Sequence, residues 1–165
     1  KSNNFFPLPE PLIQKNFSRV MSLRDGKKKM SKSEDSDYSR IDLKDTEDEI
    51  KKKIKKAKTD SLPIPEKIED LKDRAEALNL LAIYSSITDS TLEKTLQEMS
   101  GKDFSKFKDN LSDALIATIC PIGRKIKDLS KDRGYLSKIL QDGSTKARKI
   151  AEKNLSKIKE IVGFI

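Results

Sequence analysis

The sequence predicts a mainly α-helical fold, and two features of the chain carry this prediction. After residue 46 the apolar side chains recur every three to four positions, which is the spacing of one buried helix face. Helix-capping residues precede several of these runs, and glycine or proline follows them. Charged residues make up 38% of the chain and hydrophobic residues 35%. Because the apolar positions are periodic, this composition still supplies a core.

The first 45 residues lack this helical pattern. A loop or short helix is expected to end near residues 7–10, and a helical or connecting stretch follows to Phe17. The apolar stretch at residues 19–23 predicts a short strand. Soon after it comes Lys29-Met30-Ser31-Lys32-Ser33. We call these five residues the signature loop.

A basic helix is expected next. Thr46 and Glu49 have the spacing of a capping box, in which each side chain satisfies a backbone amide of the first helical turn. The helix is predicted to run from there to about Thr59, and the two prolines within residues 62–65 break it.

The following two helices are placed by their caps. One is expected over residues 73–87. Ser90 with Glu93 predicts the cap of the next, and Gly101 is expected to end it, because glycine readily adopts the left-handed conformation that terminates helices.

The last part of the chain predicts a longer helix and two more. Aromatic and aliphatic residues at helical spacing run through residues 104–119, and Pro121 either kinks this helix or starts a continuation to Leu129. A short helix is expected to end at Gly143, and the final helix to carry the apolar residues of 147–162.

The charge distribution suggests a polyanionic partner. The chain holds 35 Lys and Arg against 27 Asp and Glu, a formal net charge of +8. Six lysines crowd the basic helix and are expected on every face except the buried one: Lys51, Lys52, Lys53, Lys55, Lys56 and Lys58. Such a run fits either a solvated helix face or a direct contact with RNA, and the sequence leaves both open.

Several classes of protein are disfavoured by composition. With one cysteine, Cys120, and no histidine, an internal disulfide is excluded and no metal site is expected. Cys120 is expected to be a small buried side chain on a helix. No apolar run approaches the roughly 18 residues of a membrane span, and the start of the chain lacks the apolar stretch of a signal peptide. A protein without membrane contact, located in the cytoplasm, is therefore expected.

The composition of the signature loop suits the neutralisation of a polyphosphate. Lys29 and Lys32 flank Ser31, and a lysine ammonium on a flexible stem acts as a point charge that can follow a pyrophosphate as it departs. The serine hydroxyls add neutral donors. A solvated basic turn is the alternative interpretation of the same five residues.

Several short motifs follow the signature loop in a definite order. They are Asn79-Leu80-Leu81 with Ile83-Tyr84, Gly101-Lys102-Asp103-Phe104 with Phe107-Lys108, Pro121-Ile122, and Gly143 with Lys146-Ala147-Arg148. In this order, and with the run from Phe17 to Asp60, the chain resembles the bacterial-type tryptophanyl-tRNA synthetases, a family of class I aminoacyl-tRNA synthetases. The resemblance covers nearly the whole chain.

The chain departs from the family pattern at three places. Gly26-Lys27 stands where the family usually has Pro-Thr, Ala75 where Pro is common, and Glu34 where Asp often follows the signature. Each departure lies beside a matching residue, so the departures are expected to loosen the loop and do not contradict the resemblance to the family.

The resemblance implies the ATP-dependent activation of tryptophan and its transfer to tRNA(Trp), with ATP and Mg²⁺ as cofactors. This chemistry needs cations on the leaving phosphates rather than a general acid or base, so the lack of histidine is no objection. Lys29 and Lys32 are the expected catalytic residues: Lys32 contacts the leaving phosphates, and Lys29 supports it together with the serine hydroxyls of the loop. The nucleotide-binding residues that the resemblance implies are Val20, Met21, Lys29, Met30, Ser31, Lys32 and Ser33.

The resemblance also implies that the chain is the C-terminal half of such an enzyme, because it has no His-Ile-Gly-His word or Thr-Ile-Gly-Asn-like variant. Residues 1–45 are expected to hold the last strand and signature loop of a Rossmann-type nucleotide fold. Residues 46–165 are expected to form a helical bundle, an anticodon-binding-like domain whose last helix packs back on the catalytic domain. The tryptophan pocket, and a homodimer contact, are expected in the other half.

Contacts with tRNA are assigned from charge alone, to Arg124, Arg133, Arg148 and Lys149. The aromatic residues Tyr84, Phe104 and Phe107 have core spacing and are expected to be buried rather than to stack on bases. Three alternatives remain: a noncatalytic basic helical module that binds RNA, a structural helical bundle for protein contacts, and a part of a tyrosyl-tRNA synthetase. The noncatalytic module would bind tRNA but no nucleotide, and the structural bundle would bind neither.

Overall fold

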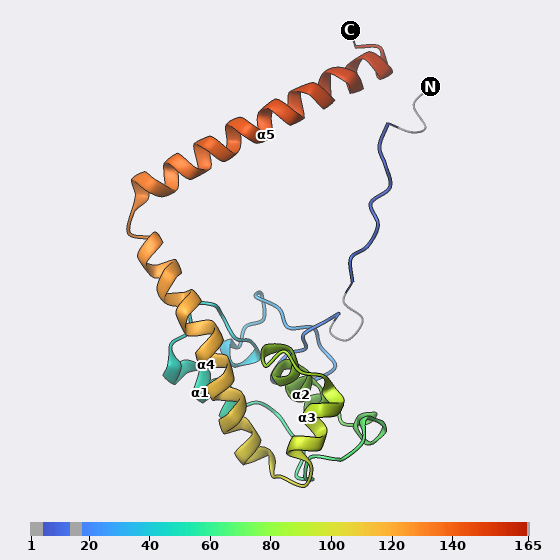
Figure 1. Ribbon diagram of the computed structural model, residues 1–165, viewed down its shortest axis with the longest axis vertical. Helices are drawn as coiled ribbons and strands as arrows, with labels where there is room; N and C mark the ends of the chain where they lie inside the picture. The colour runs from blue at the N-terminus through green and yellow to red at the C-terminus, as the bar shows by residue number, and fades with distance from the viewer. Residues whose placement is uncertain (1–4, 14–17, 165) are drawn as a thin grey trace. The chain divides into compact units, whose positions relative to one another are not determined.

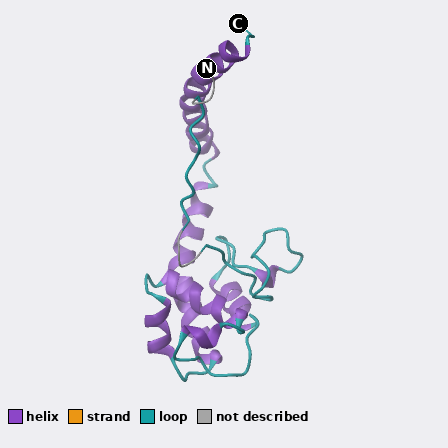
Figure 2. Ribbon diagram, turned by 90° about the vertical axis from the view of Figure 1, so that its right-hand side faces the viewer, coloured by secondary structure: helices purple, strands orange, loops and turns teal. Residues whose placement is uncertain are grey.

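The structure is a computed structural model that describes residues 5–13 and 18–164. Over these residues it is mainly helical, and no strand is formed (Figure 2). The α-helices are α1 (Glu47–Lys55), α2 (Ala75–Ile87), α3 (Leu92–Met99), α4 (Phe104–Leu129) and α5 (Arg133–Val162). Short 3₁₀ helices cover Asp37–Ser39 and Ile68–Leu71. The prediction of a mainly α fold is confirmed, while the stretch expected to lead to Phe17 ends on residues outside those described.

The chain divides into two compact units, one of Gln14–Ile126 and one of Lys1–Ile13 with Lys127–Ile165. The hydrophobic core lies in the first unit, where α1, α2, α3 and most of α4 gather (Figure 1). Its largest fully buried apolar side chains are Leu23, Ile50, Ile54, Ile64, Leu71, Leu80, Leu81, Leu96, Phe107 and Leu111. Residues from before and after the signature loop thus share one core with the helices.

Helix α1 begins as predicted and ends earlier than predicted. Thr46 and Glu49 form the complete capping box. The helix stops at Lys55 rather than near Thr59, because the amide of Lys58 donates to the carbonyl of Leu23 at 2.8 Å instead of continuing the helix. At the same end the ammonium of Lys108 donates to the carbonyl of Ala57 at 2.7 Å, and burial lowers the pKa of Lys108.

Helix α3 is capped by a different residue from the one expected. The hydroxyl of Thr91, not that of Ser90, accepts a hydrogen bond from the amide of Lys94. Gly101 follows the end of the helix with a φ of 72°, as a helix-terminating glycine should. Helix α2 starts at Ala75, two residues later than predicted.

Helix α4 matches one of the two predicted alternatives, while α5 is longer than the sequence indicated. Helix α4 continues through Pro121, which lacks one amide donor but does not end the helix. Helix α5 runs through Gly143 without a break, so the predicted stop there is wrong. Glycine in a helix interior weakens it by only about 1 kcal/mol, and the residue that ends α5 is Gly163, with a φ of 80°.

None of the described residues of α5 is buried. Its exposed apolar side chains recur at helical spacing: Tyr135, Ile139, Leu140, Ile150, Leu155, Ile161 and Val162. The predicted packing of this helix on a catalytic domain stays a prediction.

Candidate functional site

The signature loop belongs to a larger loop that is closed at its base. The amide of Leu23 donates to the carbonyl of Ser39 at 2.8 Å, and residues 24–38 extend from this point. The side chain of Leu23 is buried and its carbonyl is held by Lys58 at the end of α1. The base of the loop is therefore part of the hydrophobic core, although its tip is exposed.

The expected strand at residues 19–23 is replaced by a single antiparallel bridge between Met21 and Lys29. The amide of Ser22 donates to the carbonyl of Lys28 at 2.8 Å, and the amide of Met30 donates to the carbonyl of Val20 at 3.0 Å. A strand needs neighbouring strands to satisfy its backbone, and the described residues supply only this short return of the same loop.

The other edge of this segment is bonded to a side chain of α2. Asn79 is buried; its Oδ1 accepts from the amide of Met21 at 2.9 Å, and its Nδ2 donates to the carbonyl of Met21 at 2.9 Å. The sequence identified Asn79 only as part of a family motif and did not indicate this role. A lone asparagine on an apolar helix face is the signal that could have found it, because a buried amide must be hydrogen-bonded.

The two lysines of the signature loop point to solvent. Lys29 and Lys32 are exposed, and neither ammonium has a hydrogen-bond or ion-pair partner among the described residues. The hydroxyls of Ser31 and Ser33 lie 2.9 Å apart and bond to one another. The loop thus holds two unpaired cations and two hydroxyls close together on a backbone that is pinned through Met30.

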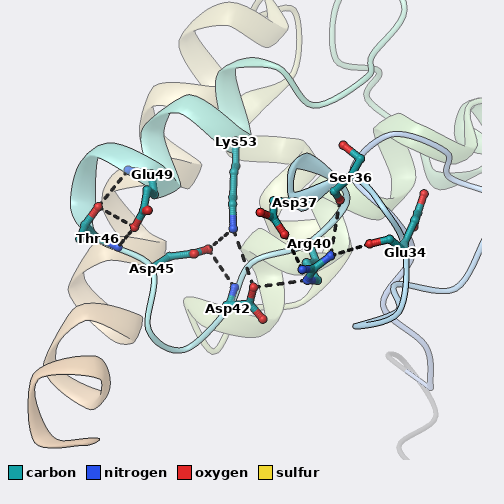
Figure 3. A network of polar contacts seen from close by, with 9 residues as sticks. All are labelled: Glu34, Ser36, Asp37, Arg40, Asp42, Asp45, Thr46, Glu49 and Lys53. Atoms are coloured by element: carbon teal, nitrogen blue, oxygen red, sulfur yellow. Dashed lines mark hydrogen bonds and ion pairs between the residues drawn. The ribbon is translucent and has the colours of Figure 1, made fainter. Parts of the chain in front are cut away.

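The chain leaves the loop through the polar network of Figure 3. Arg40 donates to the carbonyl of Glu34 at 3.0 Å and, at the limit of a hydrogen bond, to that of Ser36 at 3.5 Å. Its guanidinium also bonds the carboxylates of Asp37 at 2.5 Å and Asp42 at 3.3 Å. One side chain therefore ties four points of the loop exit together.

The network continues into α1 through a buried lysine. The ammonium of Lys53 lies 2.6 Å from the carboxylate of Asp45 and 4.0 Å from that of Asp42 (Figure 3). The side chain of Lys53 is only 8% exposed. The prediction that the lysines of this helix avoid its buried face is wrong at this position, because an ion pair compensates the burial of the charge.

The entry side of the loop packs tightly against α2. A Cβ on Gly26 would lie 2.5 Å from the backbone carbon of Ala75, so the backbones approach too closely for a side chain. Beside this contact Lys58 and Glu76 form an ion pair at 2.8 Å. The hydrogen bond that the Lys58 ammonium donates to Glu76 lowers the pKa of the Glu76 carboxyl and raises the pKa of Lys58.

The residues assigned to tRNA lie on two helices. Arg124 is on α4 and exposed, with Nη1 3.8 Å from a carboxylate oxygen of Glu47. Arg133, Arg148 and Lys149 are exposed on α5, which belongs to the other compact unit. The structure does not bring the four residues together in one described unit.

The remaining expectations concern buried side chains and exclusions. Phe104 and Phe107 are buried, as predicted, whereas Tyr84 is only partly buried. Phe107 makes edge-to-face contacts with Tyr84 at 5.4 Å and with Phe104 at 5.9 Å between ring centres. Cys120 is buried, also as predicted. Among the described residues no His, Cys, Asp or Glu side chains form a group suited to a metal ion. The search of their helices for a segment able to cross a membrane found none.

A family model described as class I tRNA synthetases (W and Y) matches residues 1–119. The chain belongs to this family. The matched residues include the whole loop, its base, and the helix that carries Asn79. The resemblance seen in the sequence motifs is thereby confirmed.

Curated relatives of this synthetase chain are tryptophan–tRNA ligases. The one from Caulobacter vibrioides is 48% identical over 97% of this chain and 46% of its own length. The one from Brucella melitensis is 45% identical over 99% of this chain and 46% of its own length. The chain spans about half the length of the curated relatives it matches.

Solved structures of tryptophanyl-tRNA synthetases resemble this chain as well. That from Mycoplasma pneumoniae has a TM-score of 0.76 at 27% identity, covering 91% of this chain and 46% of that one. That from Campylobacter jejuni complexed with ADP and tryptophan has a TM-score of 0.66 at 29% identity, covering 98% of this chain and 50% of that one.

Proposed function

We propose that this chain is part of a tryptophan–tRNA ligase and supplies its phosphate-binding loop and contacts on the anticodon side of tRNA(Trp). The observation that supports the loop's role is the pair of exposed, unpaired ammonium groups of Lys29 and Lys32, next to a backbone that is fixed by Asn79. Unpaired cations on a defined backbone are what an anionic ligand requires.

The reaction proposed is the attack of a tryptophan carboxylate oxygen on the α-phosphorus of ATP. A bond forms between that oxygen and the α-phosphorus, the bond from the α-phosphorus to the bridging oxygen breaks, and pyrophosphate leaves with the electron pair. Lys32 neutralises the charge that builds on the departing phosphates, with Lys29 in support. Ser31 and Ser33 contribute hydroxyl donors.

The magnesium ion would be held by the phosphates of ATP rather than by this chain, because the described residues contain no suitable group of ligands. When bound, Mg²⁺ neutralises phosphate charge. The lysines of the signature loop complement it without coordinating it, since an ammonium has no lone pair to offer.

Adenine is proposed to lie against Val20 and Met21, with Met30 beside them. The backbone amide and carbonyl of Met21 are both bonded to Asn79, so Met21 can contribute its side chain rather than its backbone. The amide of Met30 donates to the carbonyl of Val20, so the amide of Val20 and the carbonyl of Met30 are the backbone groups left to meet the base.

The tRNA is proposed to contact the helical part, residues 46–165, through Arg124, Arg133, Arg148 and Lys149. Residues 1–45 are proposed as the end of the catalytic domain. The exposed apolar side chains of α5 are compatible with packing against the half of the protein that this chain does not span. A homodimer formed through that half, in the cytoplasm, completes the proposal.

Two experiments test this function. In the full-length protein, pyrophosphate exchange should depend on tryptophan and not on tyrosine, which separates the proposed enzyme from a tyrosyl-tRNA synthetase. This 165-residue chain alone should show no exchange, because the amino-acid pocket lies elsewhere. Exchange by the chain alone, or exchange driven by tyrosine, would contradict the proposal. Binding of tRNA without any nucleotide binding by the full-length protein would indicate the noncatalytic RNA-binding module instead.

A further inference from the structure

We propose that Arg40 is a positioning residue for Lys32, acting by holding the exit of the signature loop. This inference rests on the proposed function of the loop. It concerns a residue that lies outside the signature and that would not itself touch the nucleotide.

The backbone around Lys32 is fixed on both sides. On the entry side, the amide of Met30 donates to the carbonyl of Val20 at 3.0 Å. On the exit side, the carbonyl of Glu34 accepts from Arg40 at 3.0 Å. Lys32 therefore lies at the middle of the short span 31–33 between two backbone anchors. Inside this span the bonds are weak or local, such as that between the hydroxyls of Ser31 and Ser33.

The anchor at the carbonyl of Glu34 depends on one side chain, whereas the carbonyl of Ser36 also accepts from the amide of Ser39 at 3.0 Å. Arg40 reaches the carbonyls of Glu34 and Ser36 and the carboxylates of Asp37 and Asp42, and it is only 14% exposed (Figure 3). An arginine suits this position because its planar guanidinium presents five donors in a fixed fork. A lysine could replace the charge but not the geometry.

The anchor is tied to the core. Asp42 bonds Arg40 and also lies 4.0 Å from the ammonium of Lys53, whose own helix α1 is packed through Ile50 and Ile54. The amide of Asp42 donates to the carboxylate of Asp45 at 2.9 Å, which holds the segment between loop and helix. Arg40 thus connects the loop exit, through Asp42 and Lys53, to the packed helix α1.

The consequence for catalysis follows from this placement. Losing the exit anchor lengthens the free segment around Lys32, and its ammonium then samples many positions instead of a few. Misplacement of a reacting group by about 1 Å can cost on the order of 10²-fold in rate. The loss should appear in kcat for adenylate formation and not in the binding of tryptophan, because Lys32 acts on charge that develops in the transition state.

The first test measures the motion of the loop without any catalysis. Asp35 is exposed and lies between the two carbonyls that Arg40 holds, so a nitroxide on Asp35→Cys reports directly on the exit. The natural Cys120 is buried, and the parent protein gives the labelling background. We expect Arg40→Ala to sharpen the electron paramagnetic resonance lines of this label. The lines of a label on Ala117→Cys, at an exposed position of α4, should stay unchanged. Unchanged lines at position 35 would overturn the proposal.

The second test measures adenylate formation by the full-length protein. Arg40→Ala should lower kcat by about 10-fold to 100-fold, with the KM for tryptophan unchanged, and Arg40→Lys should restore little of it. Lys131→Ala removes one charge from an exposed ion pair with Asp128 and should have no effect. If Arg40→Ala does not fold, Arg40→Lys decides, since it keeps a cation beside both aspartates.

The role of Arg40 and the proposed function of the loop can be disproved separately. Normal adenylate formation by the arginine variants, together with a large loss in Lys32→Ala, would overturn the role of Arg40 and leave the proposed function standing. Normal formation by Lys32→Ala would overturn both.

Discussion

Asn79 bonds both backbone groups of Met21, accepting from its amide and donating to its carbonyl at 2.9 Å each. A side chain of α2 thereby takes the place of a neighbouring strand. This arrangement explains how residues 20–22 keep an extended backbone without a sheet, and it fixes the segment that leads into the signature loop.

Asn79→Ala should destabilise the protein strongly. The substitution leaves two backbone groups of a partly buried residue without partners, and each such group costs about 1–3 kcal/mol. Denaturant unfolding of the parent and the variant would measure the difference. Asn110→Ala is the matched control, since the Asn110 amide makes only a long contact of 3.8 Å with the sulfur of Met99 and should change the free energy of unfolding much less.

Asp45→Ala should be among the most destabilising substitutions at a charged residue of this chain. It leaves the ammonium of Lys53 nearly buried with only the more distant Asp42 as a partner. Breaking a buried pair in this way costs about 3–5 kcal/mol. The same denaturant measurement on Lys53→Met with Asp45→Asn should recover most of the loss, because no charge is then buried. A double variant less stable than Asp45→Ala would contradict this explanation.

Two glycines of the long helices should respond oppositely to alanine. A Cβ on Gly123 would lie 2.6 Å from the carbonyl oxygen of Leu43, so Gly123→Ala must push the backbones apart and lower the melting temperature. Gly143 has nothing within 4 Å, and Gly143→Ala should stabilise α5 by about 1 kcal/mol. Circular dichroism during heating measures both variants. Equal effects would indicate that the close approach at Gly123 is unimportant.

Acid should remove a specific contribution to stability at Asp60. The side-chain hydrogen bonds from Arg74 hold the pKa of Asp60 below its ordinary value of 3.8. Because the folded pKa is the lower one, this contribution is present above the ordinary value and is lost as the pH falls through the folded value. Asp60→Asn should therefore lose less stability than the parent between about pH 6 and about pH 2.5. Glu66→Gln, at a residue without an ion pair in the described part of the chain, should lose as much as the parent.

The elements that the sequence predicted well are those determined by neighbouring residues. The capping box of Thr46 and Glu49 acts within one helical turn, and the spacing of Phe104 and Phe107 identifies a buried face. The errors arise where distant residues decide. Lys58 ends α1 through a bond to Leu23, and the predicted strand is held by Asn79 from 58 positions away.

The candidate site shows the same division. The unpaired lysines could be found from the signature alone, since their role needs no partner in the chain. Arg40 could not be found in this way, because its importance comes from bonds to the carbonyls of Glu34 and Ser36. Every residue has a backbone carbonyl, so the sequence does not show which carbonyls are bonded. The buried ion pair of Lys53 could not be predicted either, because the sequence does not distinguish Lys53 from the other lysines of the same helix.

The central claim is that Lys32 stabilises the departing pyrophosphate, and single-turnover formation of tryptophyl-adenylate by the full-length protein tests it most directly. Lys32→Ala should lower the rate by about 10²–10³-fold, as the loss of a preorganised donor does elsewhere, while tryptophan binding at equilibrium stays unchanged. Lys32→Arg should restore little, because a planar fork cannot follow the phosphates as a point charge does. A rate for Lys32→Ala within about threefold of the parent would contradict the claim; a large loss in Lys29→Ala alone would show that the other lysine has this role.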